Sequence, residues 1–433
     1  MTPATAPPIP ELTSILCLLF ILLVPFAVAG LALISTGLGR SRSAAHMMLS
    51  CLLVFGVGAI VFFAFGFAWQ GYAGRPGHAV SIGGKPWDLI AAEPFFWRGL
   101  KLDGSPAALA ALLGMMSAGL AAVIPLGSGG GRWRLRSAGA STAILAGITY
   151  PLFAHWAWGG GWLSQLGATY GFGMGFIDAG GALPIHAVGG VTALAITWLL
   201  APRNGKYTND RQPLALPGHN AIYVLLGCFF AWVGWIGLDC AGAILYQGAE
   251  ASRSVLIAAN ATLGAAGAML AAACITSLRY GKPDASVAGN SFVGGLVATS
   301  AGCAVMPPFA ALVVGLVAGT LVTFSIEWFE LHFTIDDPGG SIPSHLLCGL
   351  WGCVAVAIFG QAPGAGNMAG QWVAQLAGIA TLLGFTFPLS YGLNWLLDRY
   401  YPMRVRPDGE RQGMDLFELG TGAYPDFMRH NDD

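Results

Sequence analysis

Charged residues are scarce in this chain. Only 9% of its 433 residues are Asp, Glu, Lys or Arg, whereas 55% are hydrophobic, and the mean hydropathy is +0.65. Soluble domains carry charges on roughly a quarter of their residues. The composition therefore excludes an ordinary soluble domain and indicates a polytopic membrane protein. A formal net charge of −1 gives no sign of nucleic-acid binding.

Motifs of soluble catalysis are missing as well. The sequence has no phosphate-binding P-loop, no Rossmann glycine pattern and no HExxH, which argues against a nucleotide-driven pump or a zinc hydrolase. The eight cysteines stand singly in or beside apolar runs, without CxxC spacing, so we expect neither a disulfide framework nor a metal site. What remains is a channel, a secondary transporter, a membrane-embedded sensor or an integral membrane enzyme. The sequence shows no cluster of a nucleophile with a general base, so we expect no enzyme activity and no cofactor.

Long apolar runs, by contrast, fill the sequence. Eleven of them reach the roughly 20 residues that a helix needs to cross a bilayer. They lie near residues 13–36, 46–69, 106–126, 138–157, 179–201, 219–241, 254–277, 285–304, 307–329, 341–361 and 370–396. We therefore predict an all-α polytopic membrane protein with 11 transmembrane helices. The transmembrane domain is expected over residues 1–398 and a tail over residues 399–433.

Basic residues are divided unequally between the two sides of the predicted spans. One side carries fifteen: Arg40, Arg42, Arg132, Arg134, Arg136, Arg203, Lys206, Arg211, Arg279, Lys282, Arg399, Arg404, Arg406, Arg411 and Arg429. The other side carries Arg75, Lys85, Arg98, Lys101 and Arg253. Because Lys and Arg accumulate in cytoplasmic loops, we expect a cell (inner) membrane protein with its N-terminus outside and its tail in the cytoplasm.

One nine-residue segment occurs twice. DAGGALPIH, Asp178 to His186, returns as DPGGSIPSH, Asp337 to His345, and each copy leads into an apolar span. Five predicted spans separate the copies, so the two enter the membrane from opposite faces, as in an inverted repeat. Spans one to five, about 12–201, are expected to mirror spans six to ten, about 219–361. The eleventh helix, about 370–396, lies outside this symmetry.

The two histidines of this repeat are the leading candidates for a functional site. An ionisable side chain inside a transmembrane span usually faces the bundle interior or a pathway, so we expect His186 and His345 to meet near the midplane. A neutral imidazole offers one donor and one acceptor nitrogen, which suits the passage of a small amine or a proton. Two ligands alone make a poor metal site. The alternative is two similar helix starts, capped by Asp178 and Asp337, each with a structural histidine.

Taken in order, these segments resemble the ammonium transporter (Amt/Rh/Mep) family. The resemblance is carried by HWAWGGGWL at 155–163, DAGG followed by His186, GWIG at 234–237, IDDP at 335–338 followed by His345, and the tail motif RQGMDLFELGTGAY. It covers nearly the whole chain. It implies a homotrimer in which each subunit has its own narrow hydrophobic pore. Ammonium would be captured and deprotonated outside, and ammonia would cross along the histidine pair while the proton is relayed separately.

The same resemblance implies roles for single residues. His186 and His345 are the twin histidines of the pore and its proton relay. Trp158 borders the outer recruitment site for ammonium, and Asp178 holds that region in shape. The entrance is atypical, because the positions of three family phenylalanines, a family asparagine and a family serine are occupied by Leu109, Leu113, Leu238, Asp239 and Gly242.

The tail adds expectations about partners. Its GMD and GTGAY elements, at 413–415 and 420–424, resemble the family tail that couples subunits and is read by PII-type regulatory proteins. We therefore expect ammonium/ammonia transport for nitrogen uptake, with membrane lipid, a homotrimer and a PII-type protein as partners. Two alternatives stay open. One is an ammonium-binding sensor with little flux, which the altered entrance would permit, and the other is an Rh-like electroneutral gas channel.

Overall fold

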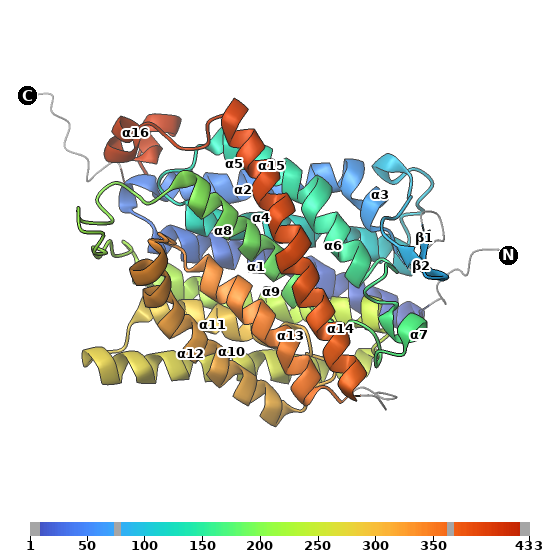
Figure 1. The fold of residues 1–433 in the computed structure, drawn as a ribbon. Helices are drawn as coiled ribbons and strands as arrows, with labels where there is room; N and C mark the ends of the chain where they lie inside the picture. Colours follow the sequence, from blue (N-terminus) through green and yellow to red (C-terminus); the bar gives the residue numbers. More distant parts are fainter. Residues whose placement is uncertain (1–8, 73–78, 362–367, 425–433) are drawn as a thin grey trace, which may run out of the picture.

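The computed structural model describes residues 9–72, 79–361 and 368–424. Within these ranges the chain forms a bundle of long helices that run side by side (Figure 1). Ten helical stretches are long and apolar enough to cross a membrane: Glu11–Leu38, Ser41–Gln70, Pro106–Gly129, Leu135–Ala157, Ala182–Leu200, Ala221–Gln247, Ala251–Tyr280, Pro308–Phe333, Ile342–Phe359 and Met368–Tyr400. The prediction of a helical, polytopic membrane fold is confirmed.

These stretches are built from the following elements. The helices are α1 (Glu11–Leu38), α2 (Ala44–Val61), α3 (Phe67–Gln70), α4 (Pro106–Gly129), α5 (Leu135–Ile144), α6 (Tyr150–Ala157), α7 (Leu166–Tyr170), α8 (Val188–Leu200), α9 (Ala221–Gln247), α10 (Ser254–Tyr280), α11 (Ala285–Ser300), α12 (Pro308–Phe333), α13 (Cys348–Phe359), α14 (Met368–Thr381), α15 (Phe387–Tyr400) and α16 (Pro407–Gln412). Five π-helical turns join or extend them inside the spans: η2 (Phe62–Gly66), η4 (Leu145–Thr149), η5 (Ala182–Ala187), η7 (Ile342–Leu347) and η8 (Leu382–Thr386). Short turns η1 (Ser41–Ser43), η3 (Phe95–Trp97), η6 (Ala251–Arg253) and η9 (Asp415–Leu419) complete the described chain.

The eighth predicted span, 285–304, is shorter in the structure than in the prediction. It corresponds to α11, Ala285–Ser300, whose 16 residues are fewer than the roughly 20 that a full crossing requires. Beyond Ser300 the backbone turns aside to pair with the Asp178 segment, because the amides of Ala179 and Gly180 donate to the carbonyls of Ala301 and Ser300 at 2.9 and 3.0 Å. The count of eleven spans thus stays a prediction.

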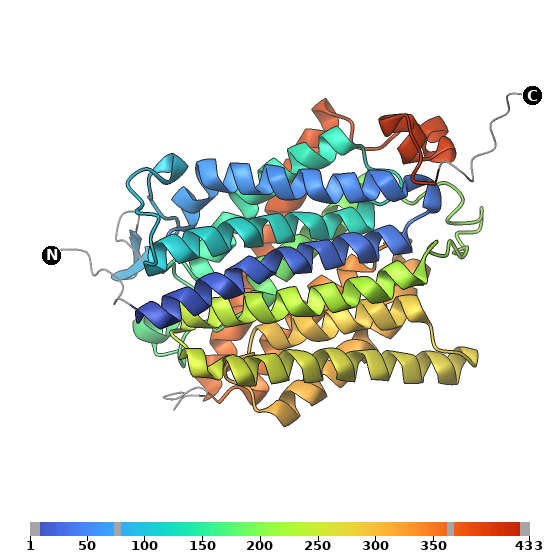
Figure 2. The same ribbon diagram turned by 180° about the vertical axis from the view of Figure 1, so that it is seen from behind.

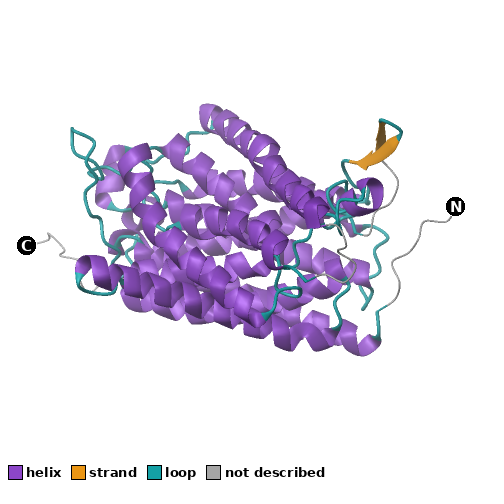
Figure 3. Cartoon of the chain, turned by 60° about the horizontal axis from the view of Figure 1, so that its bottom comes forward, coloured by secondary structure: helices purple, strands orange, loops and turns teal. Residues whose placement is uncertain are grey.

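The two faces of the bundle carry different structures. One face holds the start of α1 and a β-hairpin, β1 (Ala79–Ile82) paired antiparallel with β2 (Lys85–Asp88), which the all-helical prediction did not include (Figure 3). The other face holds the end of α15 and the residues after it, with α16 (Figure 1). We call these the hairpin face and the tail face. Arg75, Arg429 and residues 1–8 and 425–433 of the predicted domains lie outside the described residues.

Small residues allow the outer helices to pack closely. Figure 2 shows α1, α9 and α10 running along one side of the bundle. At the contact of α10 with α12, a Cβ on Gly315 would lie 2.2 Å from the Gly264 carbonyl oxygen, so a larger residue cannot fit there. Membrane helices associate through such close backbone contacts. Their outward faces remain apolar, with Ile222 and Leu278 exposed, as a lipid-facing surface requires.

The two copies of the repeated segment lie against opposite halves of the chain. The first pairs with the end of α11, as described above, and the second pairs with the end of α4, since Gly339 donates its amide to the Gly127 carbonyl at 3.0 Å. Helices α4 and α11 are the third spans of the two predicted repeats. Each repeat therefore docks its histidine-bearing segment on the third span of the other, as the predicted inverted repeat requires.

Candidate functional site

The histidines of the two repeated segments lie side by side in the interior. His186 is in η5 and His345 in η7, their ring centroids are 5.5 Å apart, and the side chains are 0% and 3% exposed. Both ring nitrogens of His186 and Nδ1 of His345 have no hydrogen-bond partner among the described residues. Buried polar atoms are normally paired, so these nitrogens are available to a molecule that passes between the helices.

Each histidine sits near the beginning of its helix. The helical turns begin at Ala182 in η5 and at Ile342 in η7. In η5, His186 is therefore preceded by four helical residues. Pro184 and Pro343 both fall inside these first turns, where a missing backbone donor is tolerated. Wide π-helical turns recur at functional sites, and here they place the two imidazoles facing each other.

The two aspartates of the repeat hold these helix starts. Asp178 accepts hydrogen bonds from the amides of Gly181, Ala182 and Leu183 at 2.7–2.9 Å. Asp337 accepts from the amide of Ile342 and the hydroxyl of Ser128, at 2.7 and 2.8 Å. Both carboxylates therefore act as caps that satisfy exposed amides of a first turn. The loop geometry depends on Gly181, whose φ of 90° is in the region that favours glycine.

Trp235 of α9 is a third member of the histidine site, and the sequence reasoning assigned it no role. Its indole stacks on His186 with ring centroids 4.6 Å apart and an interplanar angle of 13°, and it also lies 6.2 Å from the His345 ring. Its Nε1 has no partner among the described residues. The GWIG motif at 234–237 was the available signal, because a tryptophan inside a mid-membrane span is far from its usual interfacial position.

Trp158 lies between the histidine site and the hairpin face. Its Nε1 donates to the Asp178 carbonyl at 2.7 Å, which joins it to the repeated segment. One face of the indole is covered by Tyr246 from the end of α9, with centroids 4.4 Å apart and rings 3° from parallel. An aromatic stack occupies the face that a cation would use. Sequence reasoning missed Tyr246 because it belongs to a different span.

Further polar side chains are buried around this stack. Tyr72 lies 6.4 Å from Tyr246, centroid to centroid, and its hydroxyl donates to the Leu245 carbonyl at 3.0 Å. The amide group of Gln70, the Tyr246 hydroxyl and the Tyr150 hydroxyl have no partner within the portions of the chain that the structure describes. This region therefore offers several free donors and acceptors next to Trp158.

The three leucines at the predicted entrance are all buried. Leu109 and Leu113 of α4 and Leu238 of α9 are 3%, 1% and 1% exposed, and all belong to the same hydrophobic core. Leu109 also borders a groove of about 880 Å³ at the hairpin face, between the starts of α1 and α4. The leucines thus pack as apolar core, with no ring face to present to a cation.

Asp239 and Gly242 contact the loop that follows Asp178. A Cβ at Gly242 would lie 2.2 Å from the Ala179 carbonyl oxygen, so only glycine allows the loop to approach α9 there. The Asp239 carboxylate lies against Gly180 and is fully buried. Ser300 is its neighbour, but that hydroxyl donates to the Leu296 carbonyl at 2.9 Å. Both Asp239 oxygens consequently lack a hydrogen-bond partner among the described residues.

A small cavity adjoins His345 on the side of the tail face. Its volume is only about 10 Å³, and it is lined by His345 together with Leu31, Ile34, Ser35, Val123, Ile124, Asn290, Val293, Gly339, Ser341 and Ser344. The Ser344 hydroxyl donates to the Gly340 carbonyl. A cavity of this size holds about one molecule as small as water.

No group of three or more His, Cys, Asp or Glu side chains that could hold a metal ion occurs in residues 9–72, 79–361 and 368–424. The eight cysteines are free thiols. The site thus consists of unpaired nitrogens, aromatic rings and backbone carbonyls.

Known proteins resemble this chain in sequence over most of its length. The sequence model of the Ammonium Transporter Family matches residues 15–424. Amt2, an ammonium transporter of Archaeoglobus fulgidus, is 35% identical over 427 residues, which covers 94% of this chain and 86% of that protein. A putative ammonium transporter of Synechocystis is 31% identical, over 92% of this chain and 86% of the relative.

Solved structures show the same fold. A structure titled Sensor Amt Protein superposes with a TM-score of 0.84 at 27% identity and covers 94% of this chain and 98% of its own. Mep2 of Candida albicans gives a TM-score of 0.78 at 22% identity, over 96% and 90% of the two chains. The family match over most of the sequence, together with the identity to Amt2, shows that this chain is a multi-pass membrane protein of the ammonium transporter family.

Proposed function

We propose that this protein carries ammonium across the membrane by stripping its proton near Trp158 and passing ammonia along the His186–His345 pair. The observation that carries the proposal is the pair of buried imidazoles, one from each repeat, with centroids 5.5 Å apart. Three of their ring nitrogens have no hydrogen-bond partner among the described residues. Ammonia is both a donor and an acceptor, and a neutral imidazole is also both. The released proton would cross in a step separate from that of ammonia, relayed by the same two imidazoles, so net transport is of ammonium.

The apolar wall around the pair supports passage of a neutral molecule over passage of an ion. Leu31, Ile34 and Ile124 line the cavity beside His345, and a charged group in hydrocarbon surroundings costs several kcal/mol. Ammonia avoids that cost and still hydrogen-bonds to each imidazole in turn. Trp235, stacked on His186, fixes the orientation of the first ring.

The experiment is an ammonium-dependent current measured in proteoliposomes for wild type, His186→Leu and His345→Leu. Loss of a relay imidazole is expected to reduce the current by roughly tenfold or more, the scale of a lost proton-transfer group. His332→Leu is the matched control, because His332 is exposed at the end of α12 and should leave the current unchanged. A wild type that shows no ammonium-dependent current and no pH change contradicts the proposal.

An ammonium sensor is the second candidate, and one contact favours it. The stack of Tyr246 on Trp158 covers the aromatic face at the proposed recruitment site, and the chain is similar to the structure titled Sensor Amt Protein. Binding without flux distinguishes the two functions. Saturable tryptophan fluorescence changes with methylammonium, combined with absent current, would establish the sensor. A pH change without current would instead indicate an electroneutral channel.

We further propose that the hairpin face is outside the cell and the tail face in the cytoplasm. Most of the basic residues lie in tail-face segments, among them Arg132, Arg203 and Arg404, and cytoplasmic loops are enriched in such residues. A homotrimer in an inner cell membrane and a PII-type partner at the tail are part of the same proposal. Native mass spectrometry gives the subunit number, and pull-down with a purified PII-type protein, with and without residues 401–433, tests the partner.

A further inference from the structure

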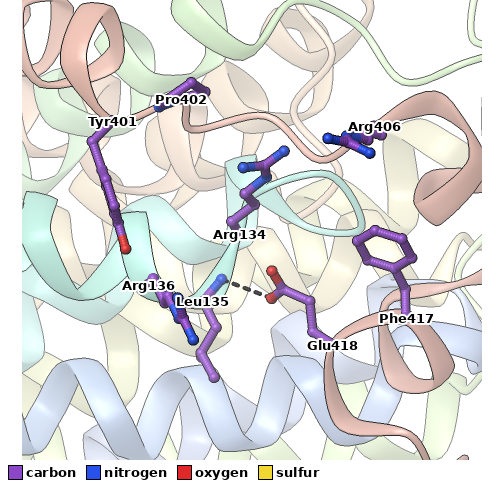
Figure 4. A pocket seen from close by; sticks show the side chains of 8 residues that line it. All are labelled: Arg134, Leu135, Arg136, Tyr401, Pro402, Arg406, Phe417 and Glu418. Carbon is purple, nitrogen blue, oxygen red and sulfur yellow. Dashed lines mark hydrogen bonds between the residues drawn. The ribbon is translucent and has the colours of Figure 1, made fainter.

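A basic pocket opens at the tail face, away from the histidine site. Its volume is about 480 Å³, and three arginines, Arg134, Arg136 and Arg406, contribute to its wall (Figure 4). The remaining lining residues are Leu135, Tyr401, Pro402, Phe417 and Glu418. The transport pathway proposed above makes no use of this pocket.

The three arginines differ from their neighbours in having no ion-pair partner among the described residues. Nearby Arg132, Arg203 and Arg404 each form an ion pair, with Asp336, Asp336 and Glu410. Arg134, Arg136 and Arg406 form none with the residues that the structure describes, and the Nε of Arg134 is buried without a hydrogen bond. Arg136 and Arg406 are exposed, and because each guanidinium has five donors, the pocket presents many N–H groups that can exchange water for an anion.

One carboxylate also lines the pocket, but it is already engaged. Glu418 accepts from the His46 ring and from the Leu135 amide, both at 2.8 Å, and Figure 4 shows the second of these bonds. Burial raises the pKa of Glu418, but the bonds from His46 and Leu135 and the charge of Arg134 together lower it below its ordinary value. The carboxylate stays ionised and bonded to these partners, and does not pair with any of the three arginines.

The walls of the pocket are fixed by backbone hydrogen bonds. The Arg134 amide donates to the Met403 carbonyl at 3.0 Å, and the Val405 amide donates to the Arg132 carbonyl at 2.9 Å. These bonds tie the α4–α5 turn to the segment after α15, so Arg134 and Arg406 are brought together by rigid backbone. A preorganised site loses little free energy to ordering when it binds.

We propose that this pocket binds a phosphate-bearing anion and that the bound anion fastens the tail to the bundle. The planar fork of arginine matches two phosphate oxygens at once, and Tyr401 adds a hydroxyl at the pocket edge. Phe417 and Glu418 of the tail form one wall while Arg134 and Arg136 form another, so a ligand that bridges them holds the tail in place. The phosphate belongs either to a phospholipid headgroup or to a soluble phosphate compound.

The test measures thermal unfolding of the full chain in neutral detergent, with pyrophosphate against chloride at matched ionic strength. A parallel arm compares nanodiscs of phosphatidylglycerol with nanodiscs of phosphatidylcholine. Saturating anion should raise the wild-type Tm by roughly 2–4 °C. The Arg134→Gln and Arg406→Gln variants should lose at least half of that rise. A response to lipid alone, to pyrophosphate alone or to both identifies the source of the phosphate.

Arg211→Gln is the matched control, since Arg211 is exposed in the loop between α8 and α9 and does not line the pocket. It should respond like wild type. Arg134→Lys keeps the charge but not the fork, and a partial response distinguishes recognition from misfolding. The proposal is overturned if wild type responds to neither ligand, or if the pocket variants respond as fully as Arg211→Gln.

Discussion

The histidine site and the Asp336–Arg203 pair of the tail face differ in how their buried polar groups are satisfied. At the tail face, Asp336 accepts from Arg203 at 2.8 Å on both oxygens and also faces Arg132. In the interior, His186, Trp235 and Asp239 all carry buried polar atoms without a partner among the described residues. Asp336 and His186 are 1% and 0% exposed, so burial alone does not explain the contrast between them.

The ion pairs and hydrogen bonds of Asp336, Glu410 and Asp415 at the tail face act as a latch that holds the tail and the loops in place. The histidine site, by contrast, belongs to the proposed pathway. At the tail face, Glu410 holds Asn204 and Arg404, and Asp415 accepts from the amides of Ala45 and His46 at the start of α2. Every such bond fixes the tail and the loops to one arrangement. An unsatisfied buried group costs about 1–3 kcal/mol, and in the pathway proposed above a passing ammonia molecule would supply the missing bond.

The largest expected effect comes from breaking the latch. Asp336→Asn leaves Arg203 and Arg132 buried without their shared carboxylate, and removing one partner of a buried ion pair costs about 3–5 kcal/mol. Thermal unfolding in detergent, followed by tryptophan fluorescence, should show this loss. Lys206→Gln serves as a comparison, because its bond to Glu330 is at a partly exposed position and should cost much less. Equal stability of Asp336→Asn and wild type would mean that the tail face is not a latch.

Acid should weaken the same latch in a defined pH window. Burial raises the pKa of Asp336, but its hydrogen bonds with Arg203 and the charges of Arg132 and Arg203 lower it from 3.8 to about 2. Because the folded-state pKa is the lower one, the stabilisation is present above pH about 4 and is lost as the pH falls toward 2. The amount is roughly 2–3 kcal/mol. The Tm of wild type should fall over this window more than that of Asp336→Asn, and parallel curves would contradict the assignment.

Most of the fold could be predicted from the sequence because apolar run length is a local signal. The predicted run 307–329 corresponds to α12, Pro308–Phe333. The β-hairpin was not predicted, although Gly83 and Gly84 between its strands have positive φ and a two-residue glycine turn is a hairpin signal. Helix α11 ends early because its last carbonyls pair with Ala179 and Gly180, a contact between distant segments that no local pattern encodes.

The site was predictable only where the repeat marked it. His186 and His345 could be paired from matching segments, and the caps Asp178 and Asp337 from their position before a helix start. Tyr246 and Trp235 could not be placed, because their contacts with Trp158 and His186 join different spans. The family resemblance places leucines where relatives have phenylalanines at the entrance. The aromatic ring that the structure shows beside Trp158 is that of Tyr246, at the end of α9.

A smaller effect is expected from exposing the indole face of Trp158, which lies next to the histidine site. Tyr246→Leu removes the ring that covers the indole and should lower the ammonium concentration for half-maximal current about two- to fivefold, the scale of a partly exposed cation–π contact. Tyr246→Phe keeps the stack and is the matched control, with little change expected. A rise in the half-saturating concentration for the leucine variant would show instead that Tyr246 itself binds the cation.

The smallest effect is expected where the same chemical change as at Asp336 is made beside the pathway. Asp239→Asn replaces a buried carboxyl group that has no hydrogen-bond partner among the described residues, so no bond is broken, and an amide of the same shape takes its place where burial already disfavours a charge. The free energy of unfolding should change by less than about 1 kcal/mol or increase, measured in the same detergent as Asp336→Asn. A loss as large as that of Asp336→Asn would mean that Asp239 anchors the Gly180 loop as firmly as Asp336 anchors the tail face, and the distinction between latch and pathway would then fail at this residue.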